Sequence, residues 1–285
     1  NKICFNMIII CVLIISWFLS NIIHASPFVS NIRVKQIVST LVFSRVLKNL
    51  VPYIPYLTIT IENEEVFRKN VSDIIQEKKE HQVIAGVNNK SNKNINKPAL
   101  IFVNHTSMLD ALVVSYVLPN SVLKRTTALC DSRFFNIPFL GSLGKMTGQL
   151  PVYFTGNTSF KTDPKKQEKT MDKLYHRIVT KRGIGLIFPE GTLNRTKTPY
   201  QLLPLRHGSI KFAMENKLDI YSLSIHGCPT VWPAYTCNSI FNGGYPGTIN
   251  VSFKKICDGD SLHKNIRINI REIREKMQHQ LNCLL

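Results

Sequence analysis

The amino-acid sequence predicts an α/β fold, in which a mixed sheet covered by helices follows an N-terminal transmembrane or membrane-interfacial helical segment. Three observations support this prediction. Short apolar runs such as Ala99 to Val103 are typical of buried strands. Segments with helical periodicity, such as Pro164 to Arg182, separate these runs, as expected for a sheet covered by helices. A long uncharged stretch, Met7 to Ile23, precedes all of them.

The uncharged stretch has seventeen residues. With the residues just before it, its length is close to the ~20 that a helix needs to cross a bilayer. A cleaved signal peptide is the alternative, with Lys2 as its charged start and His24 to Ser26 as the cleavage site. We favour the membrane anchor. By the positive-inside rule the basic residues that follow keep their side of the membrane in the cytosol. These residues are Arg33, Lys35, Arg45 and Lys48.

The next segment, Ile32 to Val51, places apolar residues among these bases at near-helical spacing. It is predicted to form a helix, which either lies in the membrane interface or packs on the core. Pro52 ends this helix, and a strand from Leu57 to Ile61 follows. We therefore expect residues 1–55 to form the anchor and interfacial helix, and residues 56–285 to form the globular domain. Within that domain residues 62–97, rich in Lys, Glu and Asn, are expected to be partly helical and partly disordered.

The remaining chain alternates between strand-like and helix-like segments, which is the pattern of one large α/β domain. The predicted strands are Ala99 to Val103, Thr126 to Cys130, Leu150 to Phe154, Ile184 to Phe188, Leu218 to Ile225 and Ile249 to Phe253. The predicted helices are Met108 to Leu118, Pro138 to Met146, Pro164 to Arg182, Gly208 to Asn216 and Leu262 to Leu284, and a loop from Asn242 to Pro246 joins the last two strands.

Composition restricts the partners. The chain has 36 Lys and Arg against 18 Asp and Glu, a net charge of +18, so its partner is expected to be nucleic acid, a membrane surface or a phosphorylated substrate. It contains no zinc-ligand spacing, RNA-recognition signature or helix-turn-helix pattern, which argues against nucleic acid. Its seven cysteines form no C-x-x-C pair and are expected to act as small apolar residues in a reducing compartment.

A histidine ends the first buried strand. His105 follows the run that closes at Val103, and Asp110 lies in the first turn of the helix behind it, with Ser107 as the expected N-cap. One interpretation is that the Asp110 carboxylate caps the helix. The other is that it bonds one imidazole nitrogen and leaves the second nitrogen as a general base. This pairing requires His105 to lie outside the helix, because five positions within one helix diverge by about 140°.

A second polar turn follows the strand that ends at Phe188. Its sequence is Phe-Pro-Glu-Gly-Thr-Leu-Asn-Arg, from Phe188 to Arg195. Gly191 allows close approach of the backbone to a ligand, Thr192 offers a hydroxyl, and Arg195 offers a planar fork suited to phosphate. An ordinary exit from a strand into a loop is the alternative interpretation of this segment alone.

Together, H-x-x-x-x-D after a strand and F-P-E-G-T about eighty residues later resemble the glycerolipid acyltransferase family, which includes 1-acylglycerol-3-phosphate acyltransferases. The resemblance implies that residues 56–285 form an acyltransferase domain, with catalytic and substrate-binding residues on these two motifs. The implied catalytic residues are His105 and Asp110, and the implied substrate-binding residues are Glu190, Gly191, Thr192 and Arg195, with Arg206 as a weaker candidate.

The chain departs from the family pattern at three positions. Phe154 stands where the segment between the two motifs has an arginine, and Leu193 replaces an arginine in the second motif. The fourth family segment, matched here by Leu218 to His226, lacks its proline. These departures keep the catalytic pair and leave the identity of the acyl acceptor open.

The function that the resemblance implies is transfer of a fatty acyl chain from acyl-CoA to the free hydroxyl of 1-acylglycerol 3-phosphate, giving phosphatidic acid. The alternatives are an acyltransferase for another acceptor, such as glycerol 3-phosphate or a head-group lysophospholipid, and a non-catalytic basic protein that binds membrane or nucleic acid. We expect direct transfer without an acyl-enzyme, and backbone N–H groups near Ser107 as candidates to stabilise the oxyanion. Acyl-CoA is then a co-substrate, and neither a metal nor a cofactor is expected.

The expected partners are membrane lipid, acyl-CoA and a lysophospholipid, with no nucleic acid. The expected location is the endoplasmic reticulum membrane, with the catalytic domain facing the cytosol. Two N-x-S/T triplets, beginning at Asn104 and Asn194, fall inside the proposed site, where a glycan would block the substrate.

Overall fold

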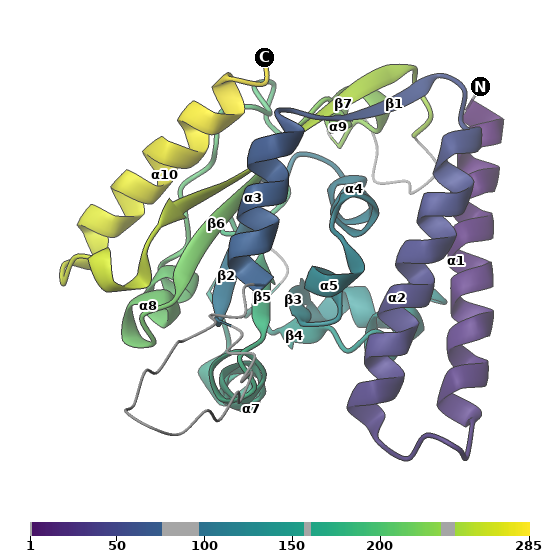
Figure 1. Cartoon of the computed structure of the whole chain (residues 1–285), viewed down its shortest axis with the longest axis horizontal. Coiled ribbons are helices and arrows are strands. Elements are labelled where there is room, and N and C mark those ends of the chain that lie inside the picture. Colours follow the sequence, from purple (N-terminus) through teal and green to yellow (C-terminus); the bar gives the residue numbers. More distant parts are fainter. Residues whose placement is uncertain (1, 76–96, 157–160, 235–242) are drawn as a thin grey trace, which may run out of the picture.

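The computed structural model describes the chain except residues 1, 76–96, 157–160 and 235–242 (Figure 1). In the described residues, strands assemble into a seven-stranded sheet with the order β1-β7-β6-β2-β5-β3-β4. Their bounds are β1 Leu57–Ile61, β2 Ala99–Val103, β3 Thr126–Asp131, β4 Leu150–Val152, β5 Ile184–Ile187, β6 Asp219–His226 and β7 Gly247–Cys257.

The sheet is mixed. Strands β6, β2, β5, β3 and β4 run parallel to one another, whereas β7 is antiparallel to β6 and carries β1 as a parallel neighbour. The central strand β2 is buried along its whole length, as expected for a parallel strand covered on both faces. The predicted fold class, a mixed sheet covered by helices, is confirmed.

Two layers of helices cover the sheet. Buried residues of α1, α3, α4, α5 and α9 pack on one face, and buried residues of α7, α8 and α10 pack on the other. The helix bounds are α1 Lys2–Ala25, α2 Ile32–Leu50, α3 Glu64–Ile75, α4 Asp110–Val117, α5 Asn120–Leu123, α6 Leu140–Met146, α7 Pro164–Tyr175, α8 His207–Glu215, α9 Cys228–Val231 and α10 Ile266–Asn282.

Helices α1 and α2 form an antiparallel pair on the opposite side of the molecule from α10 (Figure 1). Helix α1 is long and apolar enough to cross a membrane. It also contacts the domain near both of its ends: the Phe5 ring packs edge-on against Trp232, and His24 Nε2 lies 3.1 Å from the Met146 carbonyl oxygen. The side chains of one row along α1 remain exposed. They are Ile3, Met7, Ile10, Ile14, Phe18 and Ile22.

Most predicted elements are confirmed with small shifts of their ends. The Leu150 to Phe154 strand is shorter than predicted, because after Val152 the chain forms only an isolated bridge between Phe154 and Thr162. The short helix α9 was not predicted, since four residues are too few to show a helical period. Helix α3 supplies the helical part predicted within residues 62–97, whereas the disorder predicted there falls mostly on residues 76–96, outside the described residues.

Candidate active site

Two neighbouring parallel strands bring the two motifs together. Strands β2 and β5 pair with Phe102 opposite Ile187, so both chains leave the sheet at the same edge. His105 follows β2 and Glu190 follows β5, and the backbone N–H of His105 donates to Glu190 Oε1 at 2.9 Å. The imidazole of His105 stacks on the ring of Phe188, with ring centroids 4.1 Å apart. His105 and Glu190, which are 85 positions apart in the sequence, are thereby in direct contact.

His105 and Asp110 form a pair. The Nδ1 atom of His105 lies 3.1 Å from Asp110 Oδ2, and the His105 side chain is 21% exposed whereas that of Asp110 is fully buried. An ionised carboxylate only accepts hydrogen bonds, so the pair places the proton on Nδ1 and leaves Nε2 as an acceptor. The site therefore holds an imidazole that is oriented on one side and accessible on the other.

Asp110 also holds the turn that leads into α4. Its Oδ2 atom accepts hydrogen bonds from the backbone N–H groups of Thr106, at 2.6 Å, and Ser107, at 2.8 Å. The carboxylate thus accepts hydrogen bonds from backbone N–H groups of the turn before α4 and does not cap the helix itself, and these bonds hold the oxygen that contacts the imidazole. The helix begins at Asp110, two residues later than predicted.

The N–H of Ser107 itself donates to Asp110, so the expectation that backbone N–H groups near Ser107 stabilise an oxyanion stays a prediction for the other groups of this turn. Ser107 instead supports the turn through its hydroxyl. Its Oγ atom accepts a hydrogen bond from the Leu109 N–H at 3.1 Å and donates one to the Trp232 carbonyl oxygen at 2.7 Å. Ser107 therefore holds the turn before α4 and ties it to the segment after α9, whereas the N-cap position predicted for Ser107 is occupied by Leu109.

Glu190 is buried behind the site. Its two carboxylate oxygens accept hydrogen bonds from backbone N–H groups, Oε1 from His105 and Oε2 from Leu203 at 2.8 Å. Burial raises the pKa of Glu190, while these two N–H donors act in the opposite direction and favour the carboxylate. The structure places Glu190 as a support of the loop, and the contact with substrate expected for it stays a prediction.

The loop after β5 folds back over His105. The backbone N–H of Asn194 donates to the His105 carbonyl oxygen at 2.7 Å, so both backbone groups of His105 bond to this loop. Arg195 is the next residue and its side chain is exposed. Thr192 lies half-buried in the same loop. Arg195 therefore directly follows the residue whose backbone bonds His105, and its role in binding the acceptor stays a prediction.

Gly191 and Arg206 are in contact. Gly191 has a φ of 69°, and a Cβ atom there would lie 2.8 Å from Cγ of Arg206. The Nε atom of Arg206 donates to the Glu190 carbonyl oxygen at 3.1 Å. Glycine is therefore needed both for the backbone conformation and for the passage of the arginine side chain. Among the candidate site residues, Arg206 was the one that the spacing of the motifs indicated least clearly.

Sequence reasoning missed several neighbours of the pair. The carboxamide of Asn104 bonds both backbone groups of Ile225 at 2.8 Å and fastens the end of β2 to β6. Cys228, on α9, is fully buried, and burial together with the nearby Asp110 carboxylate raises the pKa of its thiol well above the usual range. A thiol that stays protonated is a poor nucleophile, because the thiolate is the reactive form. No sequence signal connects Cys228 to Asp110, because the strands β3 to β6 lie between the two residues in the sequence.

The chain is similar to known acyltransferases. The family model described as Acyltransferase matches residues 59–226, more than half of the chain. A protein of Cocos nucifera named 1-acyl-sn-glycerol-3-phosphate acyltransferase is 25% identical over 137 residues, which are 48% of this chain and 40% of that protein. One of the same name from Limnanthes douglasii is 24% identical over 144 residues, 50% of this chain and 46% of that protein. The chain thus spans less than half of these curated relatives.

A solved structure agrees with the fold. The crystal structure of the 1-acyl-sn-glycerophosphate acyltransferase PlsC from Thermotoga maritima matches with a TM-score of 0.60 at 13% sequence identity. The match covers 99% of this chain and 94% of that one. The likeness extends to the N-terminal helices as well as the sheet.

Proposed function

The chain belongs to the acyltransferase family, and from that premise we propose that it transfers a fatty acyl chain from acyl-CoA to the free hydroxyl of 1-acylglycerol 3-phosphate, giving phosphatidic acid. The observation that carries the proposal is the contact between His105 and Asp110 at the edge where both motifs leave the sheet. The names of the two plant relatives support the choice of acceptor.

The reaction follows from the orientation of the imidazole. Nε2 of His105 accepts the proton of the acceptor hydroxyl while that oxygen attacks the thioester carbonyl carbon. The buried Asp110 carboxylate stabilises the imidazolium that forms. The carbon–sulfur bond then breaks, and the imidazolium returns its proton to the CoA thiolate as it leaves. No covalent acyl-enzyme is required, which is consistent with the protonated state of the buried Cys228 thiol.

The acceptor phosphate needs a positive partner. Phe154 occupies the family position of one arginine and lies half-buried in its bridge to Thr162. Arg195 is exposed and follows the residue that bonds the His105 carbonyl oxygen. Arg206 crosses Gly191 in the same loop. We assign the phosphate to Arg195, with Arg206 as a second donor, because a guanidinium binds phosphate through two parallel hydrogen bonds.

Attachment to a membrane follows from α1 in this proposal. Its exposed row of large apolar side chains faces away from the domain, and such a face is stable in lipid. A membrane location brings the enzyme to its lipid acceptor. We place the domain on the cytosolic face of the endoplasmic reticulum. The side chains of Asn104 and Asn194 are buried and hydrogen-bonded, so neither can carry a glycan in the folded protein.

A different acceptor is the second candidate. Phe154 and Leu193 remove two arginines that the family pattern contains, and this loss of positive charge favours an acceptor without a terminal phosphate monoester. Head-group lysophospholipids, whose phosphate is a diester, fit this alternative, whereas glycerol 3-phosphate keeps the monoester and would need the same positive partner as lysophosphatidate.

The test is an assay of acceptor-dependent release of free CoA by the purified protein, with labelled acyl-CoA and a panel of lysolipids. Lysophosphatidate should be the best acceptor. His105→Ala should lower turnover by at least ~10²-fold, the usual scale of general-base catalysis. His176→Ala, at an exposed position after α7, is the control and should retain turnover. Full activity of His105→Ala would refute the mechanism, and activity only on acceptors without a phosphate monoester would favour the second candidate.

A further inference from the structure

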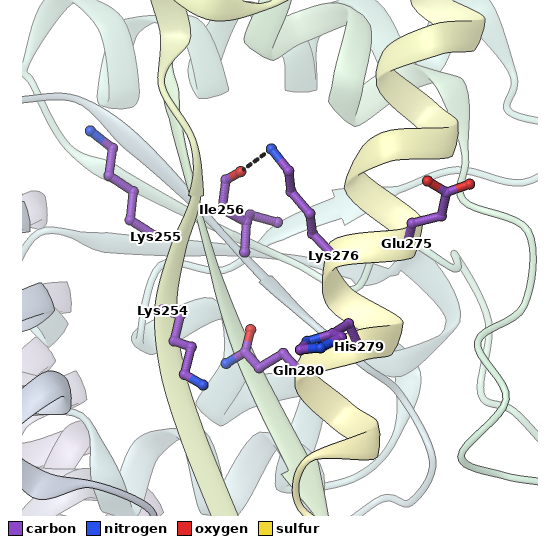
Figure 2. A pocket seen from close by; sticks show the side chains of 7 residues that line it. All are labelled: Lys254, Lys255, Ile256, Glu275, Lys276, His279 and Gln280. Carbon is purple, nitrogen blue, oxygen red and sulfur yellow. Dashed lines mark hydrogen bonds between the residues drawn. The ribbon is translucent and has the colours of Figure 1, made fainter.

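A groove of about 570 Å³ separates β7 from α10 (Figure 2). Lys254, Lys255 and Ile256 line it from the strand, and Glu275, Lys276, His279 and Gln280 line it from the helix. The register of β7 on β6 places Lys254 opposite Ser222, toward the amino-terminal half of β6. His105 follows the carboxyl end of β2, at the other edge of the sheet. The groove is thus separate from the candidate active site.

Gln280 forms the base of the groove and has an unused acceptor. Its side chain is 3% exposed, and its Nε2 atom donates to the carbonyl oxygens of Ser222, at 3.3 Å, and Ser252, at 2.9 Å. These two bonds fix the orientation of the carboxamide. Its Oε1 atom, and the nearby Ser252 hydroxyl, have no hydrogen-bond partner among the residues that the structure describes. A buried acceptor without a donor is costly, so the base favours a ligand that carries hydroxyl groups.

The rim of the groove is positive. The Nζ atom of Lys276 donates to the Ile256 carbonyl oxygen at 2.9 Å, which leaves two of its three N–H groups for a ligand. Within the described parts of the chain, no carboxylate lies within ion-pair distance of Lys276 or Lys254. Glu275 also lines the groove but pairs with neither lysine, so the lining keeps a net positive charge. A rim of this kind attracts an anion.

The neighbouring Lys255 also lines the groove, but its charge is already paired. Its ammonium lies 3.0 Å from Asp219 Oδ2 and also bonds Asp258, on the other side of the strand (Figure 2). Lys254 therefore keeps its charge for the groove although an acidic cluster is close in sequence. Successive side chains of β7 point to opposite faces of the strand, which is why Lys254 faces the groove and Lys255 pairs with Asp219 and Asp258.

We propose that this groove binds a soluble phosphate monoester that carries hydroxyl groups. The phosphate would contact Lys254 and Lys276, which bind phosphate as point charges, and a hydroxyl would donate to Gln280 Oε1. The ligand is soluble because α10 lies on the opposite side of the molecule from the exposed apolar face of α1 (Figure 1). A lipid head group held at that face would not reach the groove.

The test is titration calorimetry of the full chain in detergent with ribose 5-phosphate, inorganic phosphate and ribose as probes. Ribose 5-phosphate should bind more tightly than either of the other two. Lys254→Gln and Lys276→Gln should each weaken its binding at least about tenfold, the effect of one charged hydrogen bond. Both lysines lie at the surface, so these variants are expected to fold and to retain acyl transfer.

Two controls locate the binding. Lys169→Gln removes the same charge from an exposed position on α7 and should leave ribose 5-phosphate binding unchanged. Arg195→Ala should also leave it unchanged, because that residue belongs to the loop over His105. No heat of binding at millimolar ribose 5-phosphate would overturn the proposal, as would equal weakening by Lys169→Gln or loss of binding in Arg195→Ala. Equal affinity for inorganic phosphate would overturn the role of Gln280.

Discussion

Replacing Asp110 by asparagine removes one negative charge from beneath the imidazole of His105 and leaves the shape of the side chain almost unchanged. The orientation of the new carboxamide is determined by the backbone. Thr106 and Ser107 direct their N–H groups at the position of Oδ2, so an oxygen must occupy it. The NH₂ group cannot face the imidazole without opposing these two donors. The imidazole of the variant therefore keeps the tautomer that leaves Nε2 as the base.

The expected loss is consequently moderate. A neutral oxygen replaces a charged one in the contact at 3.1 Å with His105 Nδ1. A hydrogen bond to a charged group contributes about 1.5–3 kcal/mol, so kcat should fall by about 10- to 150-fold. A carboxamide turned the other way would enforce the wrong tautomer, for which a loss of about 10⁴-fold is typical. The geometry at Thr106 and Ser107 thus selects the smaller value.

The assay is steady-state release of CoA by Asp110→Asn, with Asp172→Asn on the exposed side of α7 as the control. Because Asp110 is fully buried and touches no substrate, the KM values for acyl-CoA and lysolipid should change little. Turnover equal to wild type would show that the carboxylate does not assist the base. A 10⁴-fold loss with an unchanged thermal midpoint would show that the backbone donors do not control the carboxamide.

Four further outcomes are expected. Arg195→Ala should raise the KM for lysophosphatidate by about 10- to 150-fold and leave acyl-CoA binding unchanged, and equal kinetics across lysophosphatidate concentrations would contradict its assignment. Glu190→Gln should lower the free energy of unfolding by about 1–3 kcal/mol, because the NH₂ group of the glutamine must face a backbone N–H. Chemical denaturation measures this change, and an unchanged midpoint would disprove it. Burial alone would raise the pKa of Asp219, but bonds from Lys97, a backbone N–H and Lys255 outweigh it and lower the pKa, so Asp219→Asn should be less stable than wild type at pH 7. This difference should vanish as the pH falls through the folded pKa, below the unfolded value of about 4, and a constant difference down to acid would refute it. Carbonate extraction should leave the full-length chain with membranes through α1, and its release would argue against a spanning or deeply inserted helix.

The elements around the site could be predicted because their patterns are strong. Five apolar residues in succession predict β2, and the polar turn behind them predicts the start of α4. The contact of His105 with Asp110 followed from this change of element, since a single helix would have separated the two side chains. Local pattern was sufficient wherever the relevant neighbours lie within a few residues.

The directions of side chains between distant segments could not be predicted. The motif containing Glu190 indicates a carboxylate but not that it faces the backbone of His105 and Leu203. The burial of Cys228 against Asp110 depends on how α9 packs, and four residues show no helical period. The groove above Gln280 likewise depends on the packing of α10 against β7, which no spacing within either segment encodes.

His105 is bonded to one loop through both of its backbone groups, its N–H to Glu190 and its carbonyl oxygen to the N–H of Asn194. In the proposed function, acceptor recognition and proton transfer share one rigid frame, because a change in the shape of the loop backbone would tilt His105. The side chains of Arg195 and Thr192 take no part in these two bonds. A change of acceptor preference during evolution should therefore proceed by exchange of these side chains, and insertions between Glu190 and Asn194 should abolish turnover for every acceptor alike.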